Sequence, residues 1–478
     1  MFELVIGLEV HAQLNTKTKL FCSCLTSYGN TPNKHTCPVC LGLPGALPKT
    51  NEAAVSKALK LATAIGATKN DNSIFERKNY FYPDSPVGYQ ISQLERPIVE
   101  FGEIEIKDKD GDDKIIRINR AHLEVDAGKS THFNGYSLID LNRAGTPLLE
   151  IVTEPDFSNS TEVGNYLKKL QSIVRYLDIS NANMEEGSFR CDVNISIRPI
   201  GSKELFTRVE IKNMNSIKFI EKAIAYEFDR QVEAWEDNTY ETQIRQETRL
   251  FNTDTLQTKS MRSKEDANDY RYFPDPDLLE ITIPDDMIKE SNTIPEMPDK
   301  KVERYVNEYK LNKEEAERIV QDITLNTSFE YLIEQGAKPK TALTWLVVEL
   351  VGRLNKRHTN IKDSSITMET LSTLISNIEN KNISSSSGKV ILDYLFDNED
   401  KDIETIIEKL NLKQINNDDL IIDILNDLIK SNPDMIEEYK AGKKKVIGSF
   451  VGQIMKKTNG QANPQRASEL ILEKLNLS

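Results

Sequence analysis

The order of the hydrophobic patterns along the chain is the feature that most restricts its fold. In five segments before residue 290, apolar and polar residues alternate, as they do in strands that bury one face. These segments are residues 4–14, 115–126, 148–154, 189–198 and 205–212. Helical spacing interrupts them at 55–65, 167–177 and 217–232, without a regular strand–helix alternation. The mixture predicts an α+β fold with an antiparallel sheet.

The strand patterns end near a proline-rich stretch at 284–300, which we interpret as a linker. Residues 300–400 then show helical spacing, with five apolar residues on one predicted helix face: Leu343, Leu346, Val347, Leu350 and Val351. Further helical patterns follow, which begin acidic and end basic. We therefore predict a β-rich antiparallel domain over 1–292, an all-α helical domain over 293–400 and a small α-helical tail domain over 401–478.

Charge is distributed unevenly along the chain. The 478 residues have a net charge of −14, which argues against a protein that binds nucleic acid non-specifically over its whole surface. Residues 441–478 nevertheless carry seven basic and two acidic side chains, a net charge of +5. This excess suggests that contact with phosphate groups is concentrated at the C-terminal end, with ordinary surface patchiness as the alternative.

The overall composition, with 38% apolar and 28% charged residues, is typical of a soluble globular protein. No stretch approaches the ~20 consecutive apolar residues of a membrane span. The first residues match the first strand and show neither a basic leader nor an Arg- and Ser-rich transit pattern. We expect a cytoplasmic protein without a membrane partner.

Four of the five cysteines form a CxC…CxxC array in a segment at 20–42. They are Cys22, Cys24, Cys37 and Cys40. Two tight turns that supply four thiolates suit tetrahedral Zn²⁺ and leave no open position for catalysis, so we predict a structural zinc site. Free thiols or a redox pair are the alternatives. Cys191 alternates with apolar residues and is predicted to be a buried apolar side chain.

Each predicted strand also carries carboxylates on its polar face. The polar positions are Glu9 and His11, then His122, Glu124 and Asp126, then Glu150 and Glu154, then Arg190, Asp192 and Asn194, then Arg208, Glu210 and Lys212. The solvated face of an antiparallel sheet normally looks similar. Five strands with carboxylates, two of them with a histidine, nevertheless favour a site for Mg²⁺ and phosphate.

Two tyrosine-rich loops could face this site. Residues 77–93 combine Arg77, Lys78 and four aromatic side chains with proline and glycine turns. Residues 269–277 contain a similar mixture of aromatic, charged and proline residues. Both cations are available for a triphosphate, whereas Phe81 is expected to pack. The sequence contains neither of the glycine-rich phosphate-loop motifs, so the sheet face and these loops must hold any nucleotide.

A third region of interest is the stretch 448–464. An apolar helix face precedes Lys456, Lys457 and an Asn-Gly turn. Lysines beside a helix end, followed by amide donors, would suit contacts with an RNA backbone. An ordinary capped helix hairpin explains the same pattern.

Several motifs, in order along the whole chain, resemble the B subunit of glutamyl/aspartyl-tRNA amidotransferases. They are Ile6-Gly-Leu-Glu-Val-His11, Arg77-Lys-Asn-Tyr-Phe-Tyr-Pro-Asp84, Gln90-Ile-Ser-Gln93, Asp126-Ala-Gly-Lys-Ser-Thr131, Asp140-Leu-Asn-Arg-Ala-Gly-Thr-Pro-Leu-Leu-Glu150, Met184-Glu-Glu-Gly-Ser188, Asp269-Tyr-Arg-Tyr-Phe-Pro274, Gly452-Gln-Ile-Met-Lys456 and Gly460-Gln-Ala-Asn-Pro464. Because the resemblance spans the chain, no single motif carries it.

The resemblance implies a cradle domain, a helical domain and a tail domain. In proteins of this family, the cradle binds the mischarged acceptor end of Glu-tRNA(Gln) or Asp-tRNA(Asn). With ATP and Mg²⁺ it phosphorylates the side-chain carboxylate, and ammonia then displaces phosphate to form the amide. An amidase subunit (A) supplies the ammonia from glutamine, and a small C subunit completes a heterotrimer. This chain has no Ser–Ser–Lys amidase signature, so the glutaminase is expected on another chain.

The resemblance also assigns expected roles to individual residues. His11, Glu124 and Glu150 match the Mg²⁺ ligands of the family. The remaining expected catalytic positions are Glu9, Lys78, Tyr80, Asp192 and Glu210, with nucleotide contacts expected from Lys78, Tyr82 and Arg190. The four cysteines match a Zn²⁺ site that only some members keep. The expected tRNA contacts in the tail are Lys443, Lys444, Lys456 and Lys457.

Two other functions fit parts of the sequence. A zinc-containing RNA-binding protein without catalysis would bind tRNA whether or not Glu124 or Glu150 is intact. An ATP-dependent amide ligase that acts on a small molecule would leave the basic tail unexplained.

Overall fold

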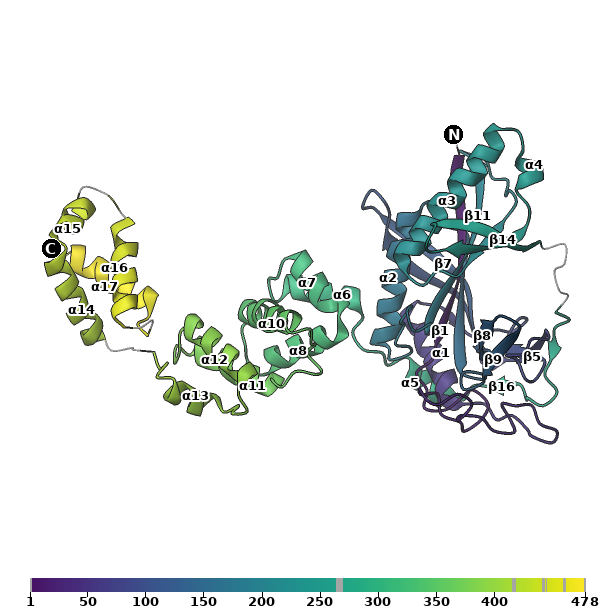
Figure 1. Cartoon of the computed structure of the whole chain (residues 1–478), viewed down its shortest axis with the longest axis horizontal. Helices are drawn as coiled ribbons and strands as arrows, with labels where there is room; N and C mark the ends of the chain where they lie inside the picture. The colour runs from purple at the N-terminus through teal and green to yellow at the C-terminus, as the bar shows by residue number, and fades with distance from the viewer. Residues whose placement is uncertain are drawn as a thin grey trace. The chain divides into compact units, whose positions relative to one another are not determined.

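The structure is a computed structural model that describes residues 2–263, 270–414, 418–440, 443, 445–458 and 461–476. Asp269 and Gly460 of the predicted motifs, and Lys444 of the predicted tRNA contacts, lie outside the described residues. The chain divides into two units, Met1–Pro298 and Asp299–Ser478 (Figure 1). A separate tail domain from residue 401 stays a prediction.

A nine-stranded sheet lies at the centre of the first unit, in the order β14-β13-β12-β11-β1-β10-β7-β6-β2. Neighbouring strands are antiparallel, except that β12 and β13 are parallel. The strands are β1 (Phe2–Gln13), β2 (Thr68–Lys69), β6 (Val99–Lys107), β7 (Asp113–Val125), β10 (Pro147–Thr153), β11 (Phe189–Pro199), β12 (Val209–Lys212), β13 (Glu247–Asn252) and β14 (Gln257–Ser263). The sheet confirms the predicted α+β fold.

Smaller sheets attach the loops to this unit. One of them joins the two tyrosine-rich loops, because β15 (Phe273–Pro274) pairs with β4 (Glu76–Asn79), which pairs with β5 (Tyr89–Ser92). The other two are the pair of β16 (Ile281–Thr282) with β3 (Asn72–Ser73), and the hairpin of β8 (Lys129–Phe133) and β9 (Tyr136–Asp140). The two loops therefore form one structure although about 190 residues separate β4 from β15.

Three helices pack on the apolar face of the main sheet. They are α1 (Glu52–Ala64), α2 (Ser160–Tyr176) and α3 (Ile217–Glu236), and the short helices α4 (Tyr240–Gln243) and α5 (Asp285–Ser291) complete the unit. The side chains of Asn51, Asn159 and Ser216 cap the first three by accepting a hydrogen bond from the first turn. These caps explain why the helices begin where they do.

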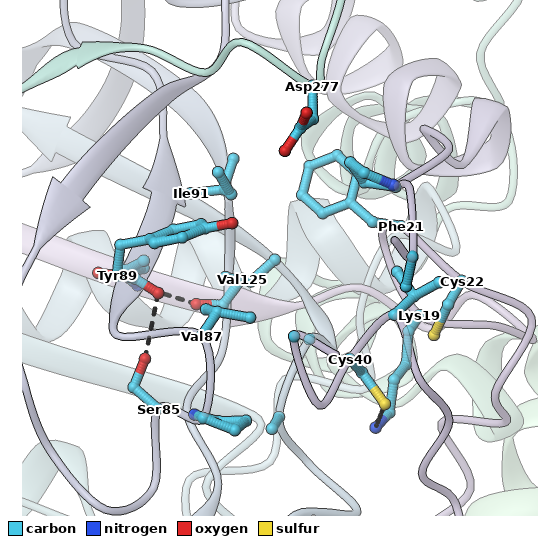
Figure 2. A pocket seen from close by; sticks show the side chains of 18 of the residues that line it. Lys19, Phe21, Cys22, Cys40, Ser85, Val87, Tyr89, Ile91, Val125 and Asp277 are labelled. Atoms are coloured by element: carbon cyan, nitrogen blue, oxygen red, sulfur yellow. Dashed lines mark hydrogen bonds between the residues drawn. The ribbon is translucent and has the colours of Figure 1, made fainter. Parts of the chain in front are cut away.

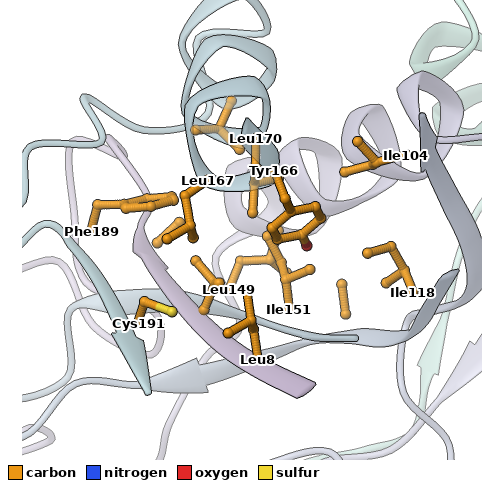
Figure 3. Packing of buried hydrophobic residues seen from close by; sticks show 14 of the residues in the cluster. Leu8, Ile104, Ile118, Leu149, Ile151, Tyr166, Leu167, Leu170, Phe189 and Cys191 are labelled. Carbon is orange, nitrogen blue, oxygen red and sulfur yellow. The ribbon is translucent and has the colours of Figure 1, made fainter. Parts of the chain in front are cut away.

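The core lies between these helices and the sheet (Figure 3). Leu8 and Leu149 of the sheet and Leu167 and Leu170 of α2 are almost completely buried, and burial of each such side chain contributes ~1.5–3 kcal/mol. Cys191 is buried among them, as predicted. Because one face of the sheet is fully occupied by this core, its other face is the one that can carry polar chemistry.

Four of the five predicted strands agree with the structure to within two residues, but the fifth does not. The predicted strand 205–212 begins only at Val209, and residues 202–208 have no regular secondary structure. The segment contains apolar side chains, yet Leu205 is 64% exposed, so its alternation does not reflect a buried face.

The described elements of the second unit are helices. They are α6 (Pro298–Asn307), α7 (Lys313–Gln321), α8 (Ile323–Glu334), α9 (Pro339–Leu343), the π-helical segment η2 (Thr344–Leu350), α10 (Val351–Lys356), α11 (Met368–Glu379), α12 (Ser385–Asp397), α13 (Ile403–Lys409), α14 (Asp418–Ser431), α15 (Pro433–Lys440), α16 (Lys445–Lys457) and α17 (Pro464–Asn476). Ile421, Phe450 and Ile471 belong to a core formed by the last four helices. No helix in the described ranges is both long and apolar enough to cross a membrane.

Candidate functional site

The polar face of the main sheet brings predicted site residues from four strands together. On β1, Glu9 and His11 alternate with core residues and therefore lie on this face. His11 is directly opposite Glu150 of β10, and Glu9 is directly opposite Asp192 of β11. The pairing of β11 with β12 adds Glu210. Strand β1 thus has acidic neighbours on both sides.

His11, Glu124 and Glu150 form one group, which we call the histidine cluster. The Nε2 atom of His11 is 3.3 Å from Oε1 of Glu124 and 3.3 Å from Oε2 of Glu150. His122 Nε2 lies 3.4 Å from the same oxygen of Glu150. One ligand atom from each member of the cluster lies within 4.8 Å of the others. Within the described chain, neither carboxylate has a Lys or Arg ion pair, which leaves their charge available to a cation.

The protonation of the histidine cluster follows from these contacts. Burial acts to lower the pKa of His11, but hydrogen bonds to Glu124 and Glu150 and their charges raise it well above its ordinary value. Burial acts to raise the pKa of Glu150, but the charge of His122 and hydrogen bonds from both imidazoles lower it well below the usual range. These shifts favour a protonated His11 beside an ionised Glu150.

Glu9, Asp192 and Glu210 form a second group with Lys212, which we call the lysine cluster. Its three carboxylates also offer ligand atoms within 4.8 Å of one another. Here Lys212 Nζ lies 2.6 Å from Asp192 Oδ2 and 3.0 Å from Glu210 Oε1. Burial acts to lower the pKa of Lys212, but the two carboxylates raise it. A fixed ammonium therefore neutralises part of this cluster.

Lys78 belongs to the loop structure beside the histidine cluster. Its strand β4 pairs with β5, and Gln90 of β5 donates a hydrogen bond of 2.8 Å to the carbonyl of Val125 at the end of β7. Gln93 accepts a hydrogen bond of 2.9 Å from the backbone N–H of Leu123 on the same strand. These bonds fix the first tyrosine-rich loop against the strand that carries Glu124.

The surroundings of Lys78 keep it charged. Its Nζ lies 5.0 Å from the centre of the Tyr270 ring, a cation–π contact. Burial acts to lower the pKa of Lys78, but Tyr272 and the carboxylates Glu124 and Glu150 raise it. Lys78 makes no ion pair within the described part of the chain, so its ammonium is available to a bound anion.

Arg77, which the sequence predicts as a second cation for phosphate, is already engaged. Its Nε lies 2.6 Å from Asp275 Oδ2, its Nη2 lies 3.0 Å from Asp277 Oδ2, and its guanidinium stacks 4.2 Å from the Tyr89 ring. Consecutive residues of a strand point to opposite sides, so Arg77 cannot share the position of Lys78. Arg77 joins the two tyrosine-rich loops.

The remaining predicted contacts differ in position. Tyr80 is half-buried, and burial raises its pKa, whereas Tyr82 is 57% exposed. Arg190 lies on the polar face but pairs with Asp126, with 3.0 Å between Nη2 and Oδ1. The expectation that Phe81 packs is wrong, because this ring is 80% exposed at the tip of a loop. Roles of these residues in binding nucleotide remain predictions.

The four cysteines of the predicted zinc site lie together. The sulfur atoms of Cys22, Cys24, Cys37 and Cys40 all lie within 4.8 Å of one another. The sulfur–sulfur distance in a tetrahedral Zn–S site is similar, ~3.8 Å. A hydrogen bond from Cys22 is the largest cause that lowers the pKa of Cys40, to about 4. A thiolate is the form that binds zinc, so the sulfur set fits the metal.

A cavity of about 280 Å³ lies between the cysteine segment and the first tyrosine-rich loop (Figure 2). Lys19, Cys22 and Cys40 line one side, and Val87 and Tyr89 line the other. The buried Lys19 donates hydrogen bonds to the carbonyls of His35 and Leu141 and lies 3.6 Å from the Cys40 sulfur. Lys19 therefore ties the cysteine segment to the loop that follows β9.

The predicted tRNA contacts lie on the second unit. Lys456 and Lys457 are exposed at the end of α16, where cations also stabilise the negative end of the helix dipole. Lys443 Nζ lies 2.9 Å from Glu438 Oε1. The position of these lysines is compatible with RNA contact, and it also has an ordinary structural explanation.

Sequence reasoning placed Lys212 and His122 on the polar face without giving either an individual role, and it did not consider Lys19. Lys212 and His122 share a strand face with predicted ligands two residues away, so the alternation pattern contains their signal. Lys19 has no comparable signal, because its contacts are to main-chain carbonyls and a sulfur far along the chain.

The sheet and its site define a member of the GatB/GatE family, to which this chain belongs. Residues 4–289 match the model described as the GatB/GatE catalytic domain, and residues 327–475 match the GatB domain. The first match contains both clusters, Lys78 and the four cysteines.

Relatives of known name match over nearly the whole chain. The B subunit of the aspartyl/glutamyl-tRNA(Asn/Gln) amidotransferase of Campylobacter hominis is 54% identical over 99% of this chain and 100% of its own length. The protein of the same name from Helicobacter hepaticus is 55% identical over 99% of both chains. That from Sulfurovum sp. is 53% identical over 100% of both.

Proposed function

We propose that this chain is the B subunit of a glutamine-hydrolysing tRNA-dependent amidotransferase. It converts Glu-tRNA(Gln), Asp-tRNA(Asn) or both into the corresponding amides, and it acts in the cytoplasm with an amidase subunit and a small C subunit. The observation that carries the proposal is the buried histidine cluster, with the unpaired ammonium of Lys78 beside it. The family and the names of the full-length relatives support the same activity.

The chemistry explains why such a site needs both signs of charge. A carboxylate is a poor acyl donor, so one of its oxygens first attacks the γ-phosphorus of ATP, and ADP leaves with the electrons of the broken P–O bond. Ammonia then attacks the acyl carbon, phosphate leaves, and loss of a proton gives the amide. The carboxylate and the triphosphate repel each other, and cations near both lower that barrier.

The residues have distinct proposed tasks. His11, Glu124 and Glu150 would hold Mg²⁺, which supplies positive charge for the phosphates. Lys78 would contact a phosphate or the substrate carboxylate, with Tyr80 and Tyr82 beside it and Arg190 as a further nucleotide contact. Glu9, Asp192 and Glu210 would position the nucleotide or the acceptor end together with Lys212.

The cysteine segment and the tail have supporting roles. Zn²⁺ bound by the four cysteines would fix the segment that lines the 280 Å³ cavity, without taking part in the reaction. Lys443, Lys444, Lys456 and Lys457 would contact the tRNA backbone, which suits the positive charge of the tail.

Amidation of Glu-tRNA and Asp-tRNA by the reconstituted three-subunit complex tests the proposal. Glu124→Ala should abolish ATP-dependent amidation, whereas Glu105→Ala, which removes an exposed carboxylate of β6 in the same sheet, should retain it. The isolated chain should not release ammonia from glutamine. Full activity of Glu124→Ala would contradict the metal assignment, and tRNA binding without ATP cleavage in the wild-type complex would favour the non-catalytic RNA-binding function.

A further inference from the structure

Tyr272 lies directly across from Lys78 in the small sheet that joins the two tyrosine-rich loops. The pairing of β15 with β4 places Phe273 opposite Arg77. In this antiparallel register, the next pair consists of Tyr272 and Lys78. Residues that are directly opposite each other in antiparallel strands project on the same side, with Cβ atoms ~4.5–5.5 Å apart. The phenol of Tyr272 and the ammonium of Lys78 are therefore neighbours on one face of this sheet.

That face is turned toward the strand that carries Glu124. On its other side, Lys78 is opposite Gln90 of β5. The Gln90 side chain donates a hydrogen bond of 2.8 Å to the carbonyl of Val125, the residue that follows Glu124 on β7. Tyr272, Lys78 and Gln90 thus form one row across three strands, and the row meets the main sheet at the histidine cluster.

The electrostatic surroundings of the half-buried Tyr272 agree with this position. Burial is the largest cause that raises the pKa of its phenol, the charge of Lys78 acts to lower the pKa, and the charges of Glu150 and Glu124 act to raise it. All three charges are therefore within electrostatic reach of the hydroxyl. Within the described chain, no hydrogen bond joins this hydroxyl to another residue. Tyr272 thus offers a neutral, protonated donor to a bound substrate.

The segment that carries Tyr272 is held in place at both of its ends. On the C-terminal side, the buried Asp275 accepts an ion pair of 2.6 Å from Nε of Arg77. On the N-terminal side, the carbonyl of Tyr270 accepts a hydrogen bond of 2.9 Å from the N–H of Asn79. The rings of Tyr270 and Tyr272 also make an edge-on contact, with 6.3 Å between their centres. A donor fixed before the reaction stabilises developing charge without the cost of reorganisation.

The two steps of the proposed reaction develop negative charge in different places. Transfer of the phosphoryl group spreads charge over several phosphate oxygens, which full cations neutralise best. Attack of ammonia on the acyl phosphate is different, because its lone pair forms the C–N bond while the π electrons of the carbonyl move onto one oxygen. Such an oxyanion is stabilised by one or two hydrogen-bond donors at a fixed position. The cross-strand pair of Tyr272 and Lys78 provides two.

We propose that Tyr272 is a catalytic residue of the second step, in which its hydroxyl donates a hydrogen bond to the acyl oxygen while ammonia attacks. The inference rests on the proposed function, because it assumes an acyl phosphate. Lys78 donates to the same oxygen from the neighbouring strand. The oxyanion then re-forms the carbonyl, phosphate leaves with the electrons of the C–O bond, and the additional proton on nitrogen passes to water. Tyr272 keeps its own proton throughout.

Separate measurement of the two steps tests the assignment. The reconstituted complex receives Glu-tRNA, ATP labelled at the γ-phosphate and ammonium chloride in place of glutamine. In a single turnover, Tyr272→Phe should slow formation of the amide about 10²-fold, while ADP forms within about twofold of the wild-type rate. Water hydrolyses the acyl phosphate that is not used, so the ATP consumed per amide should rise above the wild-type ratio. Phenylalanine keeps the ring that contacts Tyr270, so the fold should be unaffected.

The matched control is Tyr136→Phe, which makes the same change on an exposed ring of the β8–β9 hairpin and should leave both rates unchanged. Unchanged rates in Tyr272→Phe, or equal slowing of ADP and amide formation, would overturn this inference and leave the proposed function intact. Slower ADP formation alone would place Tyr272 at the phosphates and overturn it as well. A wild-type complex that forms the amide without cleaving ATP would overturn the proposed function together with this inference.

Discussion

The histidine cluster and the lysine cluster lie on one sheet face on either side of β1, and each gathers three metal-ligating groups within 4.8 Å. They differ in the group that balances their charge. An imidazole can lose its proton and become a metal ligand, whereas the ammonium of Lys212 has no lone pair to offer. The histidine cluster can therefore exchange protons for a divalent cation. The lysine cluster keeps a permanent cation, which a metal would have to displace or accompany.

The largest effect should come from the histidine cluster. Glu150→Gln removes a charge that contacts both His11 and His122, and no Lys or Arg within the described chain is paired there to compensate. We expect amidation by the reconstituted complex to fall about 10³-fold at saturating Mg²⁺. Single-turnover formation of the amide measures the loss. If Glu150→Gln kept activity within threefold of wild type, the claim that the histidine cluster, unlike the lysine cluster, binds a divalent cation would be wrong.

A smaller effect that depends on Mg²⁺ should follow from Lys212→Met. The change leaves Asp192 and Glu210 without their shared ammonium, so the phosphates meet more negative charge. Activity should fall about 10²-fold at low Mg²⁺ and recover in part as Mg²⁺ is raised, because a metal replaces the lost charge. Lys107→Met, at an exposed ion pair, is the control. A loss that no concentration of Mg²⁺ relieves would contradict this account.

The smallest effect on chemistry should come from the cysteine segment, which belongs to neither cluster. Cys37→Ser removes one of four sulfur ligands and should abolish stoichiometric zinc by elemental analysis. The melting temperature should fall by several degrees, consistent with the loss of about 1–2 kcal/mol. At 25 °C, amidation should change less than in either cluster variant. Absence of zinc from the wild-type protein would favour free thiols instead.

Sequence patterns predicted the fold class, the polar face and the groups on it, because alternation along a strand records which side chains face water. They did not separate the two clusters, since only the register shows that His11 faces Glu150 while Glu9 faces Asp192. The strand β6 was not predicted, although Ile104 and Ile106 alternate with exposed glutamates; the alternation starts only after Phe101, which adopts a φ of 58°. Arg77 could not be distinguished from Lys78 without knowing that Asp275 lies across from it.

The central position of β1 has a consequence for how this gene can change. β11 pairs with β1 over Phe2–Ala12 and β10 pairs with it over Glu9–Gln13, and the residues of β1 alternate between core and site. Loss of one codon in the middle of this strand would exchange the two faces beyond that point. The side chain of Glu9 or His11 would then point into the apolar core, and a leucine or valine would point to the polar face of the sheet. Frame-preserving deletions here should be far rarer among descendants than point substitutions.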